Sequence, residues 1–432
     1  MKTKNPITIG IDARLYGLKQ KGLGRYVQKL LENLEGAVDN IDVIAGSTKQ
    51  SRDKSGEIAA SQTPRNDREF IPRNDRYKFI VFLRKENWSE YNPKNPNFKK
   101  ALADYRWYGF KEQFFMPWDI ARKKVDLMHF PHFNVPLFCF KPFVVTIHDL
   151  ILKKFPTRRA STLGFFLYWI KNFAYHIVIS LALRRAKKII AISNYTKGDI
   201  LKYFNVNPEK IEVIYEGGAI QENTPNPNQR ILLGDVIKKF KKGISKRRPL
   251  ISGQYLLYVG NAYPHKNLER LILAFDKLNK DSQTKLQLVL VGEIDYFYRQ
   301  LQKKFSDIRG LIFTDFVTDQ KLKNLYQNAS LYVFPSMREG FGLPPLEAMN
   351  YGLPVVSSNA TCLPEVLGEA AVYFDPENTE EMSEKIKEVL INKKTRAELV
   401  SKGYERIKKY NWAKMARETI KIYGSIAKLL NC

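Results

Sequence analysis

Cysteine is scarce in this sequence: Cys139, Cys362 and Cys432 are its only three among 432 residues, and they lie far apart. An odd number of widely spaced cysteines offers neither a disulfide framework nor the paired spacing of a zinc site. The opening residues, MKTKNPITIGIDARLYG, contain no long apolar run of the kind that a secretory signal requires. These two absences predict a protein of a reducing compartment, and we expect it to be cytoplasmic.

Acidic residues are few in the first half of the chain. Residues 1–250 hold 46 Lys and Arg against 23 Asp and Glu, whereas residues 251–432 hold 25 against 21, within a total formal charge of +27. An excess confined to one half indicates a basic face that meets an anionic surface, either lipid or nucleic acid. A general richness in lysine is the alternative explanation.

Short apolar runs, most of them ended by Gly, Pro, Ser or Asp, recur in the second half. They predict strands over 255–260, 285–292, 311–317, 331–336, 353–358 and 371–374. Helical patterns separate several of these strands, such as the one that begins at Leu268 with Asn267 as the expected N-cap. Strands that alternate with helices predict a parallel sheet, whose ligands bind at the carboxyl ends of the strands.

The first half shows the same alternation. Strands are predicted over 7–12, 77–83, 127–130, 143–149, 187–193 and 211–217, with an amphipathic helix over 24–34. Because 432 residues exceed one ordinary core, the chain is predicted to be an α/β protein with two Rossmann-like, doubly wound domains that face a central cleft. Residues 47–76, which contain the repeat PRNDREFI–PRNDRYKF, are expected to form a loop insertion, and 221–250 a polar, basic linker.

Residues 163–183, LGFFLYWIKNFAYHIVISLAL, are long enough to span a bilayer. Lys171, Asn172 and His176 lie in the middle of this segment, where a charge costs about 3 kcal/mol on insertion scales. A buried or interfacial helix is therefore expected in preference to a membrane span. Aromatic clusters at 105–110 and 114–118, followed by ARKK, belong partly to a core and also suit a lipid headgroup interface.

The stretch REGFGLPPLEA, residues 338–348, holds two glutamates, Glu339 and Glu347, on either side of a glycine turn. Gly340 and Gly342 permit close approach of the backbone and unusual dihedral angles. The following proline pair suits the start of a helix, so Glu347 is expected in the first turn. The backbone N–H groups at this helix start can face an anion such as a diphosphate.

Carboxylates cannot contact phosphate favourably, so the two glutamates are expected to accept hydrogen bonds from hydroxyls. Glu347 would bind a ribose, as acidic residues do in dinucleotide folds, and Glu339 would bind a sugar. The predicted ligand is a nucleoside-diphosphate sugar. Two alternatives are surface charges at a helix start and the acid and nucleophile of a glycosidase, although the latter pair should occupy facing walls.

These residues resemble a known family. EGFGLPPLE resembles the Glu-x7-Glu motif of the retaining glycosyltransferases of family 4, which have two Rossmann-like domains in the GT-B fold. Five further segments resemble parts of that family in the expected order, namely 9–31, 143–150, 189–200, 258–275 and 410–426. The resemblance implies a hexosyltransferase of GT-B fold that uses a nucleotide-sugar donor in polysaccharide or cell-envelope biosynthesis.

The same resemblance implies three catalytic residues: Lys266, which neutralises the diphosphate leaving group, Glu339 at the sugar, and His148 near the anomeric carbon. Asn261 stands where family members often carry an arginine, so one positive charge is missing, and His265 is expected to compensate. The other implied donor contacts are Gly22, Gly24, Phe316, Val317, Gly340, Phe341, Gly342, Leu343 and Glu347, with Phe316 and Val317 at the base.

Other histidines and one lysine have structural alternatives. His148 could be a strand-end histidine without a chemical role, although the context TIHDL favours function, and Asp149 is expected to orient or cap. His129 and His132 have a spacing that hints at a metal, but they are interpreted as a structural or acceptor-side loop. Lys266 could be a solvated lysine, but a cation at a helix start is disfavoured unless an anion binds there.

The implied mechanism lets a departing phosphate oxygen take the acceptor's proton, which places the new bond on the vacated face and retains the configuration. No Asp-x-Asp occurs in the sequence, so the metal-bound strategy of the other main transferase fold lacks its ligands, and no metal or cofactor is expected. Two other classes stay open: a phosphorylase-like enzyme on the same architecture, which would need a cofactor lysine site, and a basic nucleic-acid-binding protein, for which no base-reading module is present.

The expected organisation has four parts: 1–220 is an acceptor-side domain, 221–250 a linker, 251–410 the donor domain, and 411–432 a helix that returns to the first domain. The expected partners are a nucleoside-diphosphate sugar and a glycan or lipid-linked acceptor, with peripheral contact to an anionic membrane and no nucleic acid. A PHKN loop slightly favours a mannose-type donor by resemblance.

Overall fold

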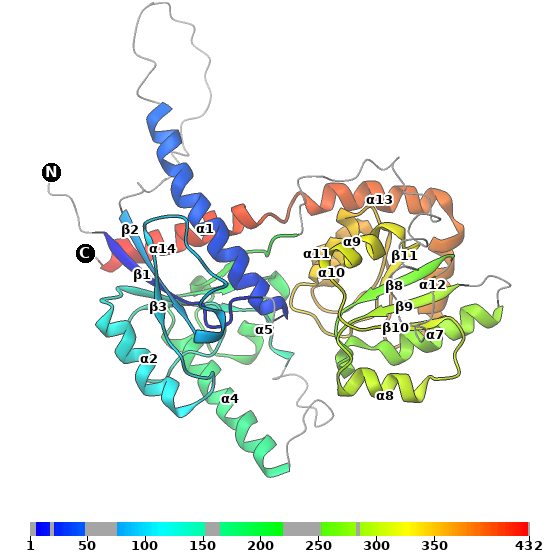
Figure 1. The fold of residues 1–432 in the computed structure, drawn as a ribbon, viewed down its shortest axis with the longest axis horizontal. Helices are drawn as coiled ribbons and strands as arrows, with labels where there is room; N and C mark the ends of the chain where they lie inside the picture. The colour runs from blue at the N-terminus through cyan, green and yellow to red at the C-terminus, as the bar shows by residue number, and fades with distance from the viewer. Residues whose placement is uncertain are drawn as a thin grey trace, which may run out of the picture.

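The computed structural model describes residues 6–17, 21–47, 76–151, 165–218, 251, 253–281 and 286–430. It forms two lobes, each built on a parallel sheet (Figure 1). Nearly all of the predicted insertion and all of the predicted linker over 221–250 lie outside the described residues. The last residues of the repeat, 77–79, belong to a strand of the first sheet.

The first sheet has seven parallel strands in the order β3-β2-β1-β4-β5-β6-β7. They are β1 (Ile7–Asp12), β2 (Tyr77–Leu83), β3 (Phe98–Leu102), β4 (Leu127–Phe130), β5 (Phe143–Ile147), β6 (Lys188–Ala191) and β7 (Ile211–Val213). The hydrophobic runs of the sequence predict all of these strands except β3, which lies at an edge of the sheet. The strand order reverses between β1 and β4, which is the place where such sheets open a crevice for ligands.

Alternate residues of these strands enter two separate cores, as the period of two in a strand requires. On one face, Ile9 and Ile11 of β1 pack under α1 (Lys21–Ser47) and α14 (Trp412–Leu430). On the other face, Met128 and Phe130 of β4 pack under α2 (Phe110–Arg122) and α4 (Phe165–Arg185), while α5 (Asn194–Tyr203) follows β6. Both faces are therefore covered, as expected for a parallel sheet.

The second sheet has six parallel strands in the order β10-β9-β8-β11-β12-β13. They are β8 (Tyr255–Val259), β9 (Gln287–Val291), β10 (Leu311–Thr314), β11 (Leu331–Phe334), β12 (Val355–Ser358) and β13 (Ala371–Phe374). The helices are α7 (Leu268–Asp281), α8 (Tyr296–Lys304), α9 (Asp319–Asn328), α10 (Leu343–Asn350), α11 (Leu363–Leu367), α12 (Thr379–Ile391) and α13 (Lys393–Ile407). The predicted α/β class with two doubly wound domains is confirmed.

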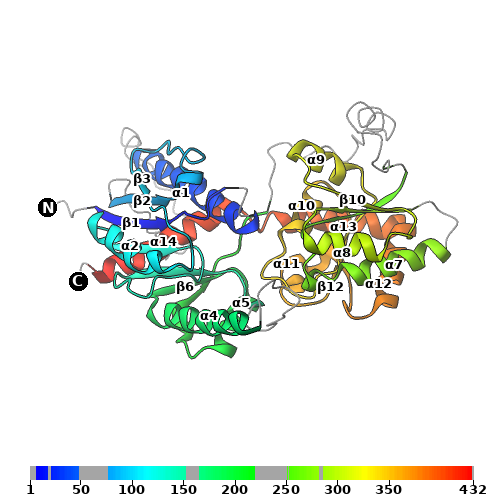
Figure 2. The ribbon, with the colours of Figure 1, turned by 60° about the horizontal axis from the view of Figure 1, so that its bottom comes forward.

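The chain passes between the domains twice, and the two passages lie side by side, since the Gly218 N–H donates to the Tyr410 carbonyl at 3.0 Å. After the second passage α14 packs against α1, so the last helix lies among elements of the first domain (Figure 2). The domains also touch at the N-terminus of α5, where the Glu365 carboxylate accepts from the N–H groups of Asn194 (2.7 Å) and Tyr195 (2.9 Å).

Helix α4 covers most of the segment that raised the question of a membrane span. Ile179, Ala182 and Leu183 of this helix are buried in the core of the first domain, while Phe173 is 69% exposed. Within the part of the chain that the structure describes, no helix combines the length and apolar character needed to cross a bilayer.

Candidate active site

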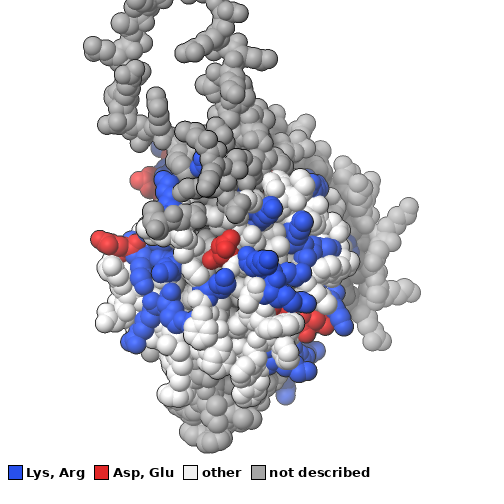
Figure 3. Space-filling view, turned by 90° about the vertical axis from the view of Figure 1, so that its left-hand side faces the viewer, with Lys and Arg blue, Asp and Glu red and all other residues white. Residues whose placement is uncertain are grey.

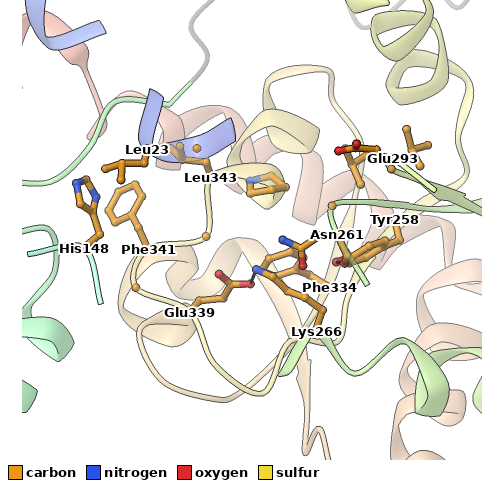
Figure 4. Close-up of a pocket in the computed structure, with 18 of the residues that line it drawn as sticks. Leu23, His148, Tyr258, Asn261, Lys266, Glu293, Phe334, Glu339, Phe341 and Leu343 are labelled. Carbon is orange, nitrogen blue, oxygen red and sulfur yellow. Dashed lines mark hydrogen bonds and ion pairs between the residues drawn. The ribbon is translucent and has the colours of Figure 1, made fainter. Parts of the chain in front are cut away.

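A cleft of about 1030 Å³ opens between the two domains at the carboxyl ends of both sheets. Its first-domain wall includes Gly22, His148 and Glu216, and its second-domain wall includes Lys266 and Glu339. Figure 4 labels His148, Lys266 and Glu339 in this cleft. Every site residue proposed from the sequence lines this cleft except Gly24 and Glu347. The structure therefore brings together residues that are far apart in the sequence, at the place where doubly wound sheets bind ligands.

The glycine turn at 340–342 approaches the first domain so closely that it leaves no room for a side chain. A Cβ at Gly340 would lie 2.0 Å from the carbonyl oxygen of His148 in the other domain. Gly342 has a φ of 89°, a left-handed conformation that favours glycine, and it is the N-cap residue directly before α10. The N–H groups of Gly342 and Leu343 are at the cleft, where an anion can bind the start of the helix.

Lys266 ends a short 3-10 turn, Pro264–Lys266, that follows β8. The next residue, Asn267, has a φ of 60°, and its side-chain amide donates to the carbonyls of Pro335 (3.1 Å) and Pro376 (2.7 Å). The Asn267 side chain thus anchors the loop to two other segments of the chain. The sequence predicted a different role for Asn267, namely the N-cap of α7. The Met337 N–H donates to the His265 carbonyl at 2.8 Å, which holds the Lys266 loop against the Glu339 loop.

The Lys266 ammonium and the Glu339 carboxylate form an ion pair of 2.6 Å at the centre of the cleft (Figure 4). Both side chains are largely buried, with 16% and 12% of their surface exposed. Lys266 is the only Lys or Arg among the described residues that line the cleft. Two of its three N–H donors remain for a ligand, because one is directed at Glu339.

His265 does not supply the missing positive charge that was expected of it. Burial, together with the neighbouring charge of Lys266, lowers the pKa of His265 to about 4, so the imidazole is neutral at neutral pH. The position of the expected arginine is occupied by Asn261, whose side chain accepts a hydrogen bond from the Tyr263 N–H at 3.3 Å. Lys266 therefore acts at this wall without a second cation from this loop.

His148 is held at both ring nitrogens by oxygen atoms. Nδ1 lies 3.0 Å from the Glu216 carboxylate and Nε2 lies 2.9 Å from the Pro131 carbonyl. Since both partners are acceptors, this geometry is best satisfied when both nitrogens carry a proton. Burial lowers the pKa of His148, but the hydrogen bond and the charge of Glu216 outweigh it, so the net pKa is raised above 6.5.

Glu347 lies beside the cleft rather than in its wall. It is the fifth residue of α10, just beyond the first turn in which it was expected. Its carboxylate forms an ion pair with Arg25 of α1 and accepts a hydrogen bond from the Tyr326 hydroxyl at 3.1 Å. No pattern in the sequence singles out Arg25, although this residue directly follows the proposed Gly22 and Gly24.

Four acidic residues of the cleft were missed as functional candidates or given only a supporting role: Asp149, Glu216, Glu293 and Asp315. Asp149 and Asp315 lie close after the ends of β5 and β10, which is the signal that could have identified them. The Asp315 carboxylate accepts hydrogen bonds from the backbone N–H groups of Ile294 (3.3 Å) and Phe316 (2.7 Å). Burial raises the pKa of Asp149, which weakens the negative charge that the cleft would present to an anionic ligand.

His129 and His132 are not part of a metal-binding cluster within the described residues. His129 is completely buried, and its nitrogens contact the hydroxyls of Tyr423 (2.6 Å) and Thr146 (2.9 Å). His132 lies at the cleft wall. Among the residues that the structure describes, no group of three or more His, Cys, Asp or Glu side chains is arranged to hold a metal ion.

Two family models match the chain, one over each domain. "Glycosyltransferase Family 4" matches residues 21–218, and "Glycosyl transferases group 1" matches residues 241–406. Among curated relatives, the O-antigen chain mannosyltransferase B of Escherichia coli is 29% identical over 312 residues, 71% of this chain and 76% of the relative. The O-antigen chain mannosyltransferase RfbU of Salmonella typhimurium is 29% identical over 60% of this chain, a match that spans 63% of that relative.

Solved structures share the whole architecture at low identity. Sucrose-phosphate synthase from Thermosynechococcus elongatus superposes with a TM-score of 0.67 at 17% identity and covers 99% of this chain and 100% of that chain. Anabaena HepE in complex with UDP and glucose gives 0.65 at 15% identity over 98% of this chain and 100% of that chain. These likenesses show that the chain has the GT-B fold, and the two family models, one over each domain, support a glycosyltransferase.

Proposed function

We propose that this protein is a retaining hexosyltransferase, with a mannose-type sugar favoured, that transfers from a nucleoside-diphosphate sugar to a hydroxyl of a glycan or lipid-linked acceptor without a metal. The observation that carries the proposal is the Lys266–Glu339 ion pair beside the open start of α10, inside the interdomain cleft. The mannosyltransferase relatives support the sugar class. The complex of HepE with UDP-glucose, a protein of the same fold, supports the donor class.

The charges that develop in the transition state suggest a role for each residue of the donor site. When the bond between the anomeric carbon and the phosphate oxygen breaks, negative charge grows on the diphosphate, where Lys266 and the N–H groups of Gly342 and Leu343 stabilise it. Glu339 then accepts hydrogen bonds from hydroxyls of the sugar, and Glu347, the second glutamate of the Glu-x7-Glu motif, from the ribose. The acceptor oxygen bonds to the anomeric carbon as its proton passes to the departing phosphate oxygen, so the configuration is retained.

His148 lies across the cleft from the Lys266–Glu339 pair, on the side from which the acceptor would approach (Figure 4). Its protonated imidazole, held by Glu216, supplies positive charge close to the developing phosphate charge. Such a charge on the first-domain wall compensates in part for the arginine that is absent at position 261. We therefore propose that His148 stabilises the developing charge electrostatically and does not donate a proton in the reaction.

We further place the protein in the cytoplasm, on the membrane face where lipid-linked acceptors are elongated. The uneven charge of the two halves of the chain supports this placement, since the excess of Lys and Arg belongs to residues 1–250.

A panel of UDP-, GDP- and ADP-sugars tests the proposed function through release of the nucleoside diphosphate. We expect turnover with one donor class, and a loss of at least about 10²-fold in kcat for Lys266→Ala, because the removed charge acts mainly in the transition state. Lys385→Ala, at an exposed pair with Glu388, is the matched control. An inverted product, or a requirement for a sugar 1-phosphate, would contradict the proposal, the latter in favour of the phosphorylase alternative.

A further inference from the structure

Helix α2 exposes aromatic side chains to solvent and buries its acids. Its exposed aromatic residues are Phe110 (90%), Phe114 (61%), Phe115 (51%) and Trp118 (59%). Met116 and Ile120 on the opposite side enter the core of the first domain. An exposed cluster of large rings on one helix is unusual for a surface that meets only water, and it marks an interaction site.

The two acids of α2 point inward and are neutralised there. Glu112 is fully buried and contacts Arg14 at 2.5 Å and Asn134 at 2.7 Å. Asp119 accepts a hydrogen bond from the Tyr105 hydroxyl at 2.6 Å, and its charge is balanced by an ion pair of 3.0 Å with the exposed Arg122. The exposed charged residues in and just after α2, through the turn before β4, are Lys111, Arg122, Lys123, Lys124 and Asp126. The outer face is therefore aromatic and positively charged.

The loop between β4 and β5 extends this surface. Phe138 stacks on Phe114 with 5.1 Å between ring centroids, and Arg185 lies 5.5 Å from the ring of Phe140, which is 84% exposed. Arg122 lies 4.8 Å from the ring of Trp118. We call the outer face of α2 with this loop the aromatic–basic face, which comprises Phe110, Lys111, Phe114, Phe115, Trp118, Arg122, Lys123, Phe138, Phe140 and Lys141.

Figure 3 views the end of the first domain at which α2 and β3 lie in Figure 1, and it shows Lys and Arg side chains spread over the described surface with few Asp or Glu. A second copy of this chain is a poor occupant for such a surface, because a symmetric contact would bring like charges together. A protein interface would also be depleted in lysine at its core. Rings surrounded by cations instead match the boundary between lipid headgroups and acyl chains.

We infer that the aromatic–basic face binds an anionic lipid bilayer, with its rings at headgroup depth and its lysines and arginines at lipid phosphates. The binding itself is independent of sugar chemistry, but its purpose, the presentation of a lipid-linked acceptor, rests on the proposed function. Tyr108, 64% exposed, has its ring 6.4 Å from that of His132, which lines the cleft. The face therefore adjoins the acceptor side of the active site.

Co-sedimentation of the full chain with phosphatidylcholine vesicles, with and without phosphatidylglycerol, tests this inference. We expect binding to the anionic vesicles that weakens as salt rises, and a loss of at least about tenfold in the partition coefficient for Phe114→Ser/Trp118→Ser and for Lys111→Glu/Lys123→Glu. The matched control is Ile391→Ser/Lys393→Glu/Lys394→Glu, which alters an exposed apolar residue and two exposed lysines of the second domain.

Equal pelleting with neutral and anionic vesicles would overturn the inference, as would face variants that pellet like the unaltered protein. A dimer that the Phe114→Ser/Trp118→Ser variant abolishes in gel filtration would also overturn it, in favour of self-association. Nucleoside-diphosphate release without vesicles is measured on the same proteins and should be unchanged. If donor turnover is absent while vesicle binding is intact, the proposed function fails and the lipid-binding face stands.

Discussion

The guanidinium of Arg25 in α1 forms an ion pair with the carboxylate of Glu347 in α10, so one interaction joins the two domains beside the cleft. The two residues are 322 positions apart in the sequence. In the proposed function Glu347 binds the ribose of the donor. Arg25 is then placed to orient that carboxylate and to tie donor binding to the approach of the two domains.

A double-mutant cycle measures this coupling. Arg25→Met and Glu347→Gln should each lower kcat/KM for the donor, and the double variant should resemble Glu347→Gln alone, because Arg25 has no partner once the carboxylate is removed. The expected interaction energy is about 1–2 kcal/mol, within the range for residues in direct contact. Lys29→Met, at the exposed pair with Glu32, serves as the control. Strictly additive effects would show that Arg25 does not act through Glu347.

His148 and Glu216 should give a pH signature. The raised pKa of His148 means that this pair contributes its full stability below the unfolded pKa of about 6.5 and loses it as pH rises through the folded value. The difference in unfolding free energy between the protein and Glu216→Gln should therefore shrink between pH 6 and pH 9. An NMR titration should show one histidine above pH 6.5 that moves below it in the variant. A pH-independent difference would contradict the assignment.

The buried His129 should affect the pH dependence of stability in the opposite direction to His148. Burial lowers its pKa to about 3, with a further contribution from the charge of His148, so the unfolded chain binds a proton that the folded protein does not. Stability should fall below pH 6.5, and at pH 5 this group costs about 2 kcal/mol relative to neutral pH. His129→Gln should reduce stability at pH 8 yet flatten the acid limb of chemical unfolding. An equally steep limb in the variant would count against this prediction.

Gly340 and Gly36 offer a matched pair of glycine substitutions. Gly340→Ala would place a Cβ 2.0 Å from the His148 carbonyl, so the domains must separate, and we expect kcat/KM to fall at least about 10²-fold because small misplacements at an active site are costly. A Cβ at Gly36, inside α1, meets nothing within 4 Å, and Gly36→Ala should stabilise the helix by up to about 1 kcal/mol. Normal activity in Gly340→Ala would show that the domain contact is dispensable.

Chelation tests the expectation that no metal takes part. The sequence contains no Asp-x-Asp, and the proposed stabilisation of the diphosphate comes from Lys266 and backbone N–H groups. Donor turnover in excess EDTA should therefore equal turnover in buffer alone. Complete loss in EDTA that manganese or magnesium restores would defeat this expectation, and a partial loss would indicate a metal that assists product release.

The strands were predictable where hydrophobic runs dominate. β1, β2 and β4 occupy the residues that the pattern indicates, because their apolar residues are buried on both faces of the sheet. β3 was not predicted, since its sequence FKKAL carries two lysines and lies at the sheet edge, where lysines protect unpaired backbone groups. The predicted helix over 24–34 is longer in the structure and continues through Gly36 to Ser47.

The position of a residue at the cleft was predictable when its own segment carries the signal. Lys266, Glu339 and the glycine turn each belong to a short motif between a strand and a helix. Arg25 and Glu216 were not predictable in this way, because their interactions with Glu347 and His148 form only in the tertiary fold. The neutral state of His265 likewise depends on burial, which its neighbours in the sequence do not reveal.

The position of α14 has a consequence for biosynthesis. This helix completes the core of the first domain, where the Tyr423 hydroxyl hydrogen-bonds to the buried His129, yet it is translated after both sheets. The ribosome therefore releases every strand of the first sheet long before that core can close. We expect the middle of the chain to mature before its beginning, which reverses the usual order in which successive domains fold during translation.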